Sequence, residues 1–249
     1  MMTNRGTGSR LTRVLGLAGL ACLATTVGLG LSLPRTQEQH EYSRLIAIHP
    51  PIAWAAYLAF GVTGLASILY LWPRTRARRW DLIAGASTEV GAVFMALTLI
   101  TGSIWGRPTW GVWWVWDARL TLTALLLVLS LGYLALRRVP APFEQRAKRS
   151  TISAMLMVVV VPIDHFAVDW WRTLHQDSSL QSAKDNLDGP FLFAMFVGFI
   201  AMTLIYAWLV VHRYRLEQLE SRLETEGLEL ALAERRAEAL TVTGAAGGA

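Results

Sequence analysis

The sequence has little charge and almost no cysteine. Asp, Glu, Lys and Arg supply 16% of its 249 residues, whereas soluble domains are about a quarter charged. Cys22 is the only cysteine, which excludes an internal disulfide and a cysteine-rich metal site. The sequence also lacks a phosphate-binding glycine loop, a dinucleotide fingerprint and the residue order of a serine-hydrolase triad. Any use of ATP therefore has to come from another chain.

Long apolar runs take the place of the missing charge. Apolar residues make up 53% of the chain, and six runs approach the length of about 20 residues that crosses a bilayer as a helix. Because no water satisfies backbone groups inside a bilayer, helices are the expected structure. We predict an all-α integral membrane protein with six transmembrane helices. Their expected positions are residues 11–33, 46–72, 82–104, 120–136, 152–168 and 191–211.

Lys and Arg are distributed unevenly between the two sides of this predicted topology. Seventeen of the 23 fall on the side of the termini and six on the other. An excess of Lys and Arg marks the cytoplasmic side, so both termini are predicted to be cytoplasmic. The six expected outside are Arg35, Arg44, Arg107, Arg119, Arg172 and Lys184. The positive net charge of the chain follows from this topology and does not indicate nucleic-acid binding.

The composition divides the chain near residue 215. Residues 1–215 are predicted to form one membrane domain with short connections, and residues 216–249 form a charged tail rich in Glu, Leu and Arg. Leucines recur in the tail at roughly heptad spacing, although Glu226 interrupts their seam. We predict a cytoplasmic helix with a disordered end at residues 244–249. A partner-binding helix and a solvated charged helix both fit this pattern.

Tryptophan is concentrated in residues 101–121, between the third and fourth apolar runs. Five of the eleven tryptophans lie here, among glycines and a proline. Indole favours the boundary between headgroups and hydrocarbon, but interfacial belts carry only scattered Trp and Tyr. We interpret this dense cluster, in an outer connection, as a flat apolar surface for a flat apolar ligand. The five are Trp105, Trp110, Trp113, Trp114 and Trp116.

Two histidines flank the tryptophan cluster from other outer segments. His49 opens the second run before two prolines, which suit the first turn of a helix, and a helix N-terminus favours the neutral imidazole that binds metals. His175 follows the fifth run, close to Trp170 and Trp171. Two imidazoles and aromatic walls suit a haem iron and its macrocycle. A capping role at the membrane surface is the alternative for His49.

Several charged or titratable residues are expected near the same face or within a span. Candidates for binding the carboxylates of haem are Arg44, Arg119 and Arg172, because guanidinium pairs well with carboxylate. Asp117 is expected to cap the fourth helix. His165 is a candidate third ligand or proton partner, although a hydrogen-bonded structural histidine is the favoured interpretation. Glu89 lies inside the third run, where an ionised group needs a partner that the sequence does not identify.

The motifs together resemble one family of membrane proteins. Trp110-Gly-x-x-Trp114-x-Trp116-Asp117 is similar to the tryptophan-rich WWD signature of haem-handling proteins. His49-Pro-Pro-Ile-Ala-Trp and Trp-Trp-x-Thr-Leu-His175 narrow the resemblance to the CcmC family, also called haem exporter protein C. The resemblance covers about residues 40–215, and the set of motifs is far more specific than any one of them.

The resemblance implies that haem b is bound non-covalently at the outer face and delivered to the haem chaperone CcmE during biogenesis of c-type cytochromes. It makes His49 and His175 the axial ligands. It further implies an ABC-type complex in the bacterial inner membrane with the ATPase CcmA, the permease CcmB and the small subunit CcmD, in which this chain is not itself an enzyme. The full expected haem-binding set is His49, His175, Trp105, Trp110, Trp114, Trp116, Asp117, Arg119, Trp170, Trp171, Arg44 and Arg172.

Two features depart from the family pattern, and two other classes of protein stay open. Arg172 stands where Asn is common, and the tail beyond about residue 216 is longer than usual. A membrane b-type cytochrome in quinone-linked electron transfer would need ligands on facing helices inside the bilayer, which two histidines at one surface do not favour. A structural permease subunit would use the tryptophans as an interfacial anchor and bind no haem.

Overall fold

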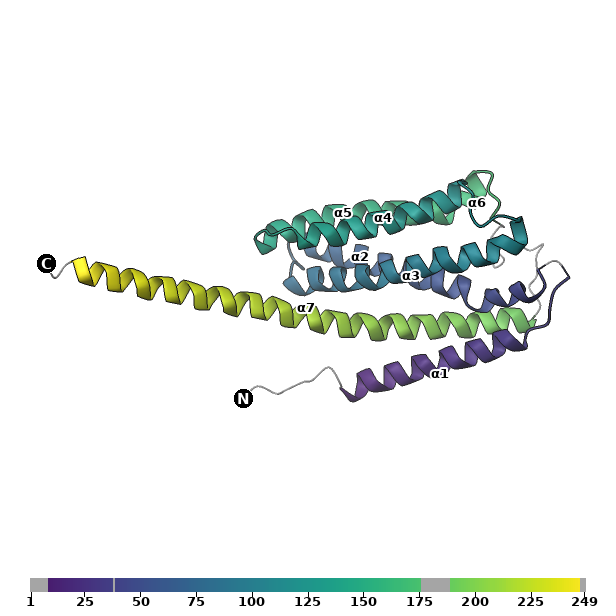
Figure 1. Ribbon diagram of the computed structural model, residues 1–249, viewed down its shortest axis with the longest axis horizontal. Coiled ribbons are helices and arrows are strands. Elements are labelled where there is room, and N and C mark those ends of the chain that lie inside the picture. Colours follow the sequence, from purple (N-terminus) through teal and green to yellow (C-terminus); the bar gives the residue numbers. More distant parts are fainter. Residues whose placement is uncertain (1–8, 38, 176–188, 247–249) are drawn as a thin grey trace.

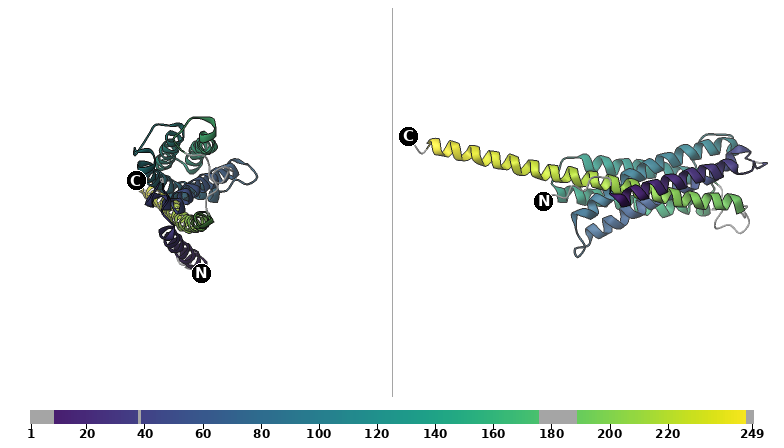
Figure 2. Two further views of the ribbon diagram at one scale, coloured as in Figure 1. Left: turned by 90° about the vertical axis from the view of Figure 1, so that its right-hand side faces the viewer. Right: turned by 90° about the horizontal axis from the view of Figure 1, so that it is seen from below.

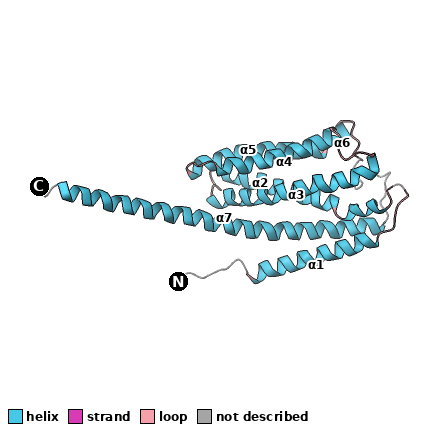
Figure 3. Cartoon of the chain, in the orientation of Figure 1, coloured by secondary structure: helices cyan, strands magenta, loops and turns pink. Residues whose placement is uncertain are grey.

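The computed structural model describes residues 9–37, 39–175 and 189–246, with side chains described up to Arg236. Apart from one isolated bridge between Thr36 and His40, the regular elements in these ranges are helices (Figure 3). They are α1 (Arg10–Ser32), the 3-10 helix η1 (Glu41–Ala47), α2 (His49–Leu71), α3 (Arg78–Trp110), α4 (Ala118–Arg138), α5 (Phe143–His165), α6 (Ala167–Trp170) and α7 (Gly189–Ala246). Lys184, and residues 247–249 of the expected disordered end, lie outside the described residues.

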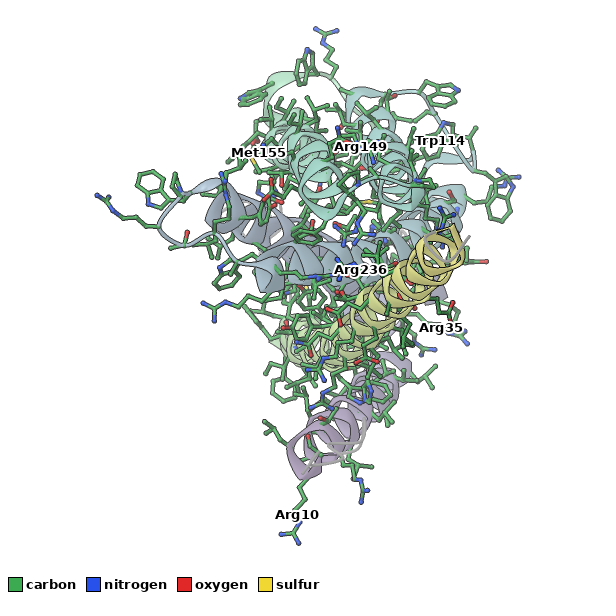
Figure 4. All side chains as sticks on the ribbon, turned by 90° about the vertical axis from the view of Figure 1, so that its left-hand side faces the viewer. Arg10, Arg35, Trp114, Arg149, Met155 and Arg236 are labelled. Atoms are coloured by element: carbon green, nitrogen blue, oxygen red, sulfur yellow. The ribbon has the colours of Figure 1, made fainter. Side chains whose placement is uncertain are left out.

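The long helices run along one axis and lie in layers (Figure 1). α4 and α5 form an outer layer, α2 and α3 lie next to them, and α7 separates that pair from α1. Seen end-on, α1 lies at the edge of the molecule, with its Arg10 far from Met155 on α5 (Figure 4). Both termini lie at one end of the bundle, here called the terminal end, and α6 lies at the other, the α6 end.

Among the described residues, five helical segments are long and apolar enough to cross a membrane: α1, η1 with α2, α3, α4 and the first part of α7. α5 is not one of them; three basic residues occupy its first two turns and Asp164 lies near its end. The predicted fifth run, 152–168, extends past the end of this helix. α5 stops at His165, where Nη1 of Arg119 donates to the carbonyl oxygens of Asp164 and His165 at 2.9 and 2.8 Å.

Small residues let neighbouring helices approach closely, as is common in membrane bundles. On α1, a Cβ at Gly16 would lie 2.8 Å from the Trp208 ring of α7. On α3, a Cβ at Gly91 would lie 2.8 Å from the Ala59 methyl of α2. Both distances are shorter than carbon atoms tolerate, so these two glycines set the spacing of the α1–α7 and α2–α3 pairs.

Ion pairs hold α7 against the bundle. Glu89 on α3 pairs with Arg213, which supplies the partner that a carboxylate inside a span requires. Arg137 on α4 binds Asp81 of α3 at 2.7 Å and Glu217 of α7 at 3.3 Å, and none of these three side chains is more than 11% exposed. The cluster of Arg137, Asp81 and Glu217 therefore joins α4, α3 and α7 through buried ion pairs.

α7 is one continuous helix across the composition boundary near residue 215. It contains the predicted last span, 191–211, and the predicted tail helix. It continues to Ala246, so residues 244–246 are helical and not disordered as predicted. The described side chains from Arg222 to Arg236 are exposed, and this part of α7 projects beyond the other helices (Figure 2). The boundary is therefore one of composition and not of helical structure.

The tryptophan-rich segment is partly helical, which corrects its expected place in a connection. α3 continues past residue 104, the predicted end of the third span, so Trp105 and Trp110 lie on its last turns. Pro108 removes one backbone donor there without ending the helix. Gly111 ends it with φ +78°, a left-handed conformation that glycine adopts without strain. Only the short segment up to Asp117 connects α3 to α4.

Candidate functional site

A cavity lies at the α6 end, where the N-terminus of α2, the last turns of α3 and the N-terminus of α4 meet. It encloses about 830 Å³ of empty space, a figure that includes the open solvent at its mouth. Its lining combines aromatic rings, small residues and two histidines. The lining residues of most interest are His49, Tyr57, Trp105, Trp110, Trp114, Arg119 and His175.

His49 is the first residue of α2, and two prolines follow it in the first turn, as predicted. Its Nδ1 lies 2.8 Å from Oγ1 of Thr101 on α3. Its ring packs edge-on against Trp105, with 5.7 Å between ring centroids. A Cβ at Gly102 would lie only 3.1 Å from its Cε1, so glycine at that position lets the imidazole lie close to α3. One hydrogen bond and two packing contacts therefore hold the ring.

His175 reaches the cavity from the segment after α6, and Asp117 holds that segment. Oδ1 of Asp117 accepts a hydrogen bond from the Leu120 N–H at 2.8 Å, so the predicted cap of α4 is confirmed. Its Oδ2 accepts from the Leu174 N–H at 2.9 Å. The His175 ring packs against Trp110, with 6.2 Å between centroids. One carboxylate thus ties the start of α4 to the residue before His175.

The clustered tryptophans divide into an inner and an outer group. Trp105, Trp110 and Trp114 line the cavity, whereas Trp113 and Trp116 are 59% and 77% exposed. The indole N–H of Trp105 donates to a glutamine side chain at 3.1 Å. That of Trp114 is buried and has no hydrogen-bond partner among the described residues. The inner group therefore forms a wall of the cavity.

Arg119 lines the cavity, but the buried Asp164 engages its guanidinium. Besides its bonds to the last carbonyls of α5, its Nε lies 3.8 Å from Oδ1 of Asp164. The Tyr57 hydroxyl donates to Oδ2 of Asp164 at 2.6 Å, and the Thr123 hydroxyl lies 3.2 and 3.3 Å from the two carboxylate oxygens. This network joins α2, α4 and α5 beside the cavity and gives Arg119 partners within the protein.

Other predicted site residues do not line the cavity. They are Arg44, Trp116, Asp117, Trp170, Trp171, Arg172 and the candidate third ligand His165. Arg44 pairs with Glu41, Arg172 is exposed, and the His165 ring packs edge-on against Tyr57 at 6.2 Å. Of the three arginines expected to bind carboxylates, only Arg119 lines the cavity. The cavity is therefore more aromatic and less basic than predicted.

The lining fits a large flat ring with axial ligands better than a bare metal ion. Among the described residues, no group of three or more His, Cys, Asp or Glu gathers to hold an ion, whereas a haem iron takes only its axial ligands from the protein. A buried donor without a partner, such as the Trp114 N–H, is unfavourable, and the carboxylates of haem are hydrogen-bond acceptors. Two imidazoles, three indole walls and this donor therefore fit haem.

Sequence reasoning missed the polar residues that position these groups. Thr101 and Tyr57 lie inside apolar runs, and their partners are 52 and 107 positions away in the chain. Asp164 carried a signal, since a carboxylate at the end of an apolar run needs a partner. Nothing in the sequence identified Arg119 as that partner.

The chain is similar to known proteins along most of its length. A family model described as heme exporter protein C matches residues 4–229. The heme exporter protein C of Haemophilus influenzae is 35% identical over 213 residues, which cover 85% of this chain and 86% of that protein. The protein of the same name in Escherichia coli K12 is 36% identical over 191 residues, covering 76% and 75%. A putative cytochrome c biosynthesis ccmC-like mitochondrial protein of Arabidopsis thaliana is 31% identical over 210 residues, covering 83% and 78%.

Proposed function

This chain belongs to the heme exporter protein C family, and we propose that it binds haem b non-covalently in the cavity at the α6 end and delivers it to the chaperone CcmE. Membership makes it a multi-pass membrane protein that handles haem in cytochrome c maturation. The observation that carries the proposal is the meeting of His49 and His175 in one cavity walled by tryptophans. The two histidines come from segments that are far apart in the sequence.

In this proposal His49 and His175 are the axial ligands, and each is held differently. His49 projects from the N-terminus of a long helix and is fixed against α3. His175 lies in a segment without regular structure, held through the Leu174 N–H by Asp117. Haem bound here would supply an iron, which the imidazoles of His49 and His175 would hold. The Trp114 N–H would donate to a haem carboxylate, and Arg119 keeps α4 and α5 in place beside the cavity.

The exposed tryptophans are proposed as the surface that meets the chaperone. Trp113 and Trp116 flank the inner tryptophans in sequence, and Trp170 and Trp171 lie at the end of α6. All four are at least half exposed. A surface this rich in exposed aromatic rings marks a contact with a partner or with the membrane interface. Because part of the cavity is open, haem can leave it without the bundle coming apart.

We propose that the cavity faces the periplasm of a bacterium and that both termini are cytoplasmic. This orientation rests on the excess of Lys and Arg on the side of the termini, and the terminal end of the bundle carries both chain ends (Figure 1). α5 is proposed as the sixth span, with its three basic residues at the cytoplasmic end. The proposed assembly is an ABC-type complex with CcmA, CcmB and CcmD, in which residues 216–249 form a cytoplasmic tail beside the membrane domain 1–215.

The absorption spectrum of the protein tests the ligand assignment. The protein is purified in mild detergent, with the partner subunits coexpressed, as wild type and as His49→Ala, His175→Ala and His212→Ala. His212 packs against Trp208 on α7 and does not line the cavity, which makes it a matched control. We expect a Soret band in wild type and in His212→Ala, and a weaker or shifted band at equal protein yield in the other two.

Other outcomes reject distinct parts of the proposal. A band that neither cavity variant changes refutes the ligand assignment. Wild-type complex without any band refutes haem binding and favours a structural permease subunit. Fast reversible reduction of the haem, with no transfer to added CcmE, favours a b-type cytochrome.

A further inference from the structure

The hydrogen bonds of Thr101 show which way its hydroxyl proton points. Oγ1 of Thr101 lies 2.8 Å from the carbonyl oxygen of Leu97, one turn earlier on α3, and 3.3 Å from that of Thr98. This is the usual bond from a helical threonine to the carbonyl four residues before it. A hydroxyl has one proton and two acceptor lone pairs. Because the Thr101 hydroxyl donates its proton to the Leu97 carbonyl oxygen, the Thr101 oxygen is the acceptor in its hydrogen bond with His49.

The hydrogen bond between Thr101 and His49 therefore has a direction. Nδ1 of His49 lies 2.8 Å from the Thr101 oxygen, and the ring is fixed there by Gly102 and by the edge contact with Trp105. Because the Thr101 oxygen accepts this hydrogen bond, Nδ1 of His49 must carry the proton that it donates. A neutral imidazole carries only one N–H proton, so Nε2 keeps its lone pair.

We propose that Thr101 is a positioning residue that selects the Nδ1–H tautomer of His49 and leaves Nε2 as the iron-binding nitrogen. Metal-bound imidazoles commonly donate their other N–H to an oxygen, which fixes the tautomer and the ring orientation and makes the ligand more basic. Here the acceptor is a neutral hydroxyl on a neighbouring helix, which is a weaker acceptor than a carboxylate. The inference rests on the proposed function for the identity of the ligand, but not for the tautomer.

The tautomer can be measured without haem. Protein labelled with ¹⁵N-histidine, purified free of haem, is studied by ¹⁵N NMR, with His49→Gln to assign the His49 signals. We expect a neutral ring with its proton on Nδ1. A proton on Nε2 in the wild type overturns the inference, whatever the protein binds.

Two substitutions test the consequence for haem. Thr101→Val keeps the shape of the side chain and removes the acceptor, whereas Thr101→Ser keeps the acceptor. Losing such a partner typically weakens metal binding about 10- to 100-fold, so Thr101→Val is expected to weaken haem binding within this range. It should also raise the iron reduction potential, because a less basic imidazole stabilises ferric iron less. Thr101→Ser should stay close to wild type in both measurements.

Thr151→Val is the matched control. Thr151 also donates to the carbonyl four residues earlier, at 2.8 Å, but it is buried in α5 away from the cavity. We expect its haem affinity and potential to equal those of the wild type. If Thr101→Val also equals wild type while His49→Ala loses the Soret band, the positioning role is wrong and haem binding stands. If the wild-type complex binds no haem at all, the proposed function fails instead, and the NMR result alone judges the tautomer.

Discussion

The two ends of the bundle use their side chains for different purposes. At the terminal end, arginines bind carboxylates across helices: Arg137 binds Asp81 and Glu217, and Arg146 lies 3.8 Å from Glu224. At the α6 end, the cavity is lined by aromatic rings and two imidazoles, and one buried indole donor there has no partner among the described residues. At the first end, charged side chains join helices through ion pairs. The second end carries the groups that are proposed to bind haem.

This difference separates the residues that stabilise the fold from those proposed to bind haem. Substitutions at the terminal end should lower stability and leave the spectrum of folded protein unchanged. Substitutions at the cavity should change haem binding with little change in stability. Arg119 and Asp164 are the exception, because they join helices at the α6 end.

The largest effect is expected from Arg137→Ala at the terminal end. Removing one partner from a buried charge cluster typically costs about 3–5 kcal/mol, because the remaining charges lose their compensation. Thermal unfolding in detergent should show a large loss, with a normal Soret band in the protein that remains folded. Arg138→Ala, at the exposed neighbouring position, is the control. Equal melting of the two variants would contradict the structural role of the cluster.

At the cavity, Trp114→Phe should weaken haem binding and spare the fold. The change keeps an aromatic ring and removes the N–H, and a hydrogen bond to a charged group contributes about 1.5–3 kcal/mol. Haem titration is expected to show at least about a tenfold loss of affinity on this estimate. Trp105→Phe should lose less, since that N–H is already bonded within the protein. An unchanged affinity in Trp114→Phe would show that its donor does not meet the ligand.

Asp117→Ser separates the two roles of one carboxylate. Serine caps a helix about as well as aspartate, but its one hydroxyl oxygen replaces two carboxylate oxygens, so the Leu174 N–H loses the oxygen that accepts from it. We expect near wild-type melting and a loss of about 1 kcal/mol in haem affinity from the freed His175 segment. Asp117→Ala should lose haem affinity and also about 1 kcal/mol of stability. If both variants bind haem with wild-type affinity, Asp117 only caps α4 and does not position His175.

The smallest effect on binding is expected from Trp116→Phe on the exposed rim. Its side chain is 77% exposed, so stability should change by less than about 0.5 kcal/mol, and haem affinity should not change. The rate of haem transfer to CcmE should fall if the rim meets the chaperone. If both Trp116→Phe and Trp113→Phe transfer haem at the wild-type rate, these two tryptophans are not part of the proposed contact with CcmE.

Hydropathy located the helices well because burial in lipid depends on local composition. α1 and α4, for example, span Arg10–Ser32 and Ala118–Arg138, against predicted runs of 11–33 and 120–136. It failed where tertiary contacts decide the ends of helices. α5 ends at His165 because a guanidinium from α4 binds its last carbonyls, and a single run contains no sign of that partner.

The site was also partly predictable, because residue types are visible in the sequence whereas contacts between helices are not. Residue chemistry selected His49, His175 and the inner tryptophans, and all of these line one cavity. Glycine and proline were interpreted as breaks between residues 101 and 121, although α3 continues through Pro108. The hydroxyl and carboxylate partners, such as Thr101, belong to pairings across helices, which depend on the packed fold and not on the pattern along one helix.

The unbroken course of α7 has a mechanical consequence. At 1.5 Å per residue, a helix of 58 residues is about 87 Å long, and it runs unbroken from the cavity to its exposed end. Its first turns, with Phe191, Ala194 and Met195, pack against η1 and Trp105 at the cavity, while its last described side chains stand clear of the bundle. The helix is therefore a lever: residues 189–221 lie along the bundle beside the cavity wall, and the part beyond them projects free of it. Any protein that grips the projecting part and tilts or rotates it also moves the residues that rest against Trp105.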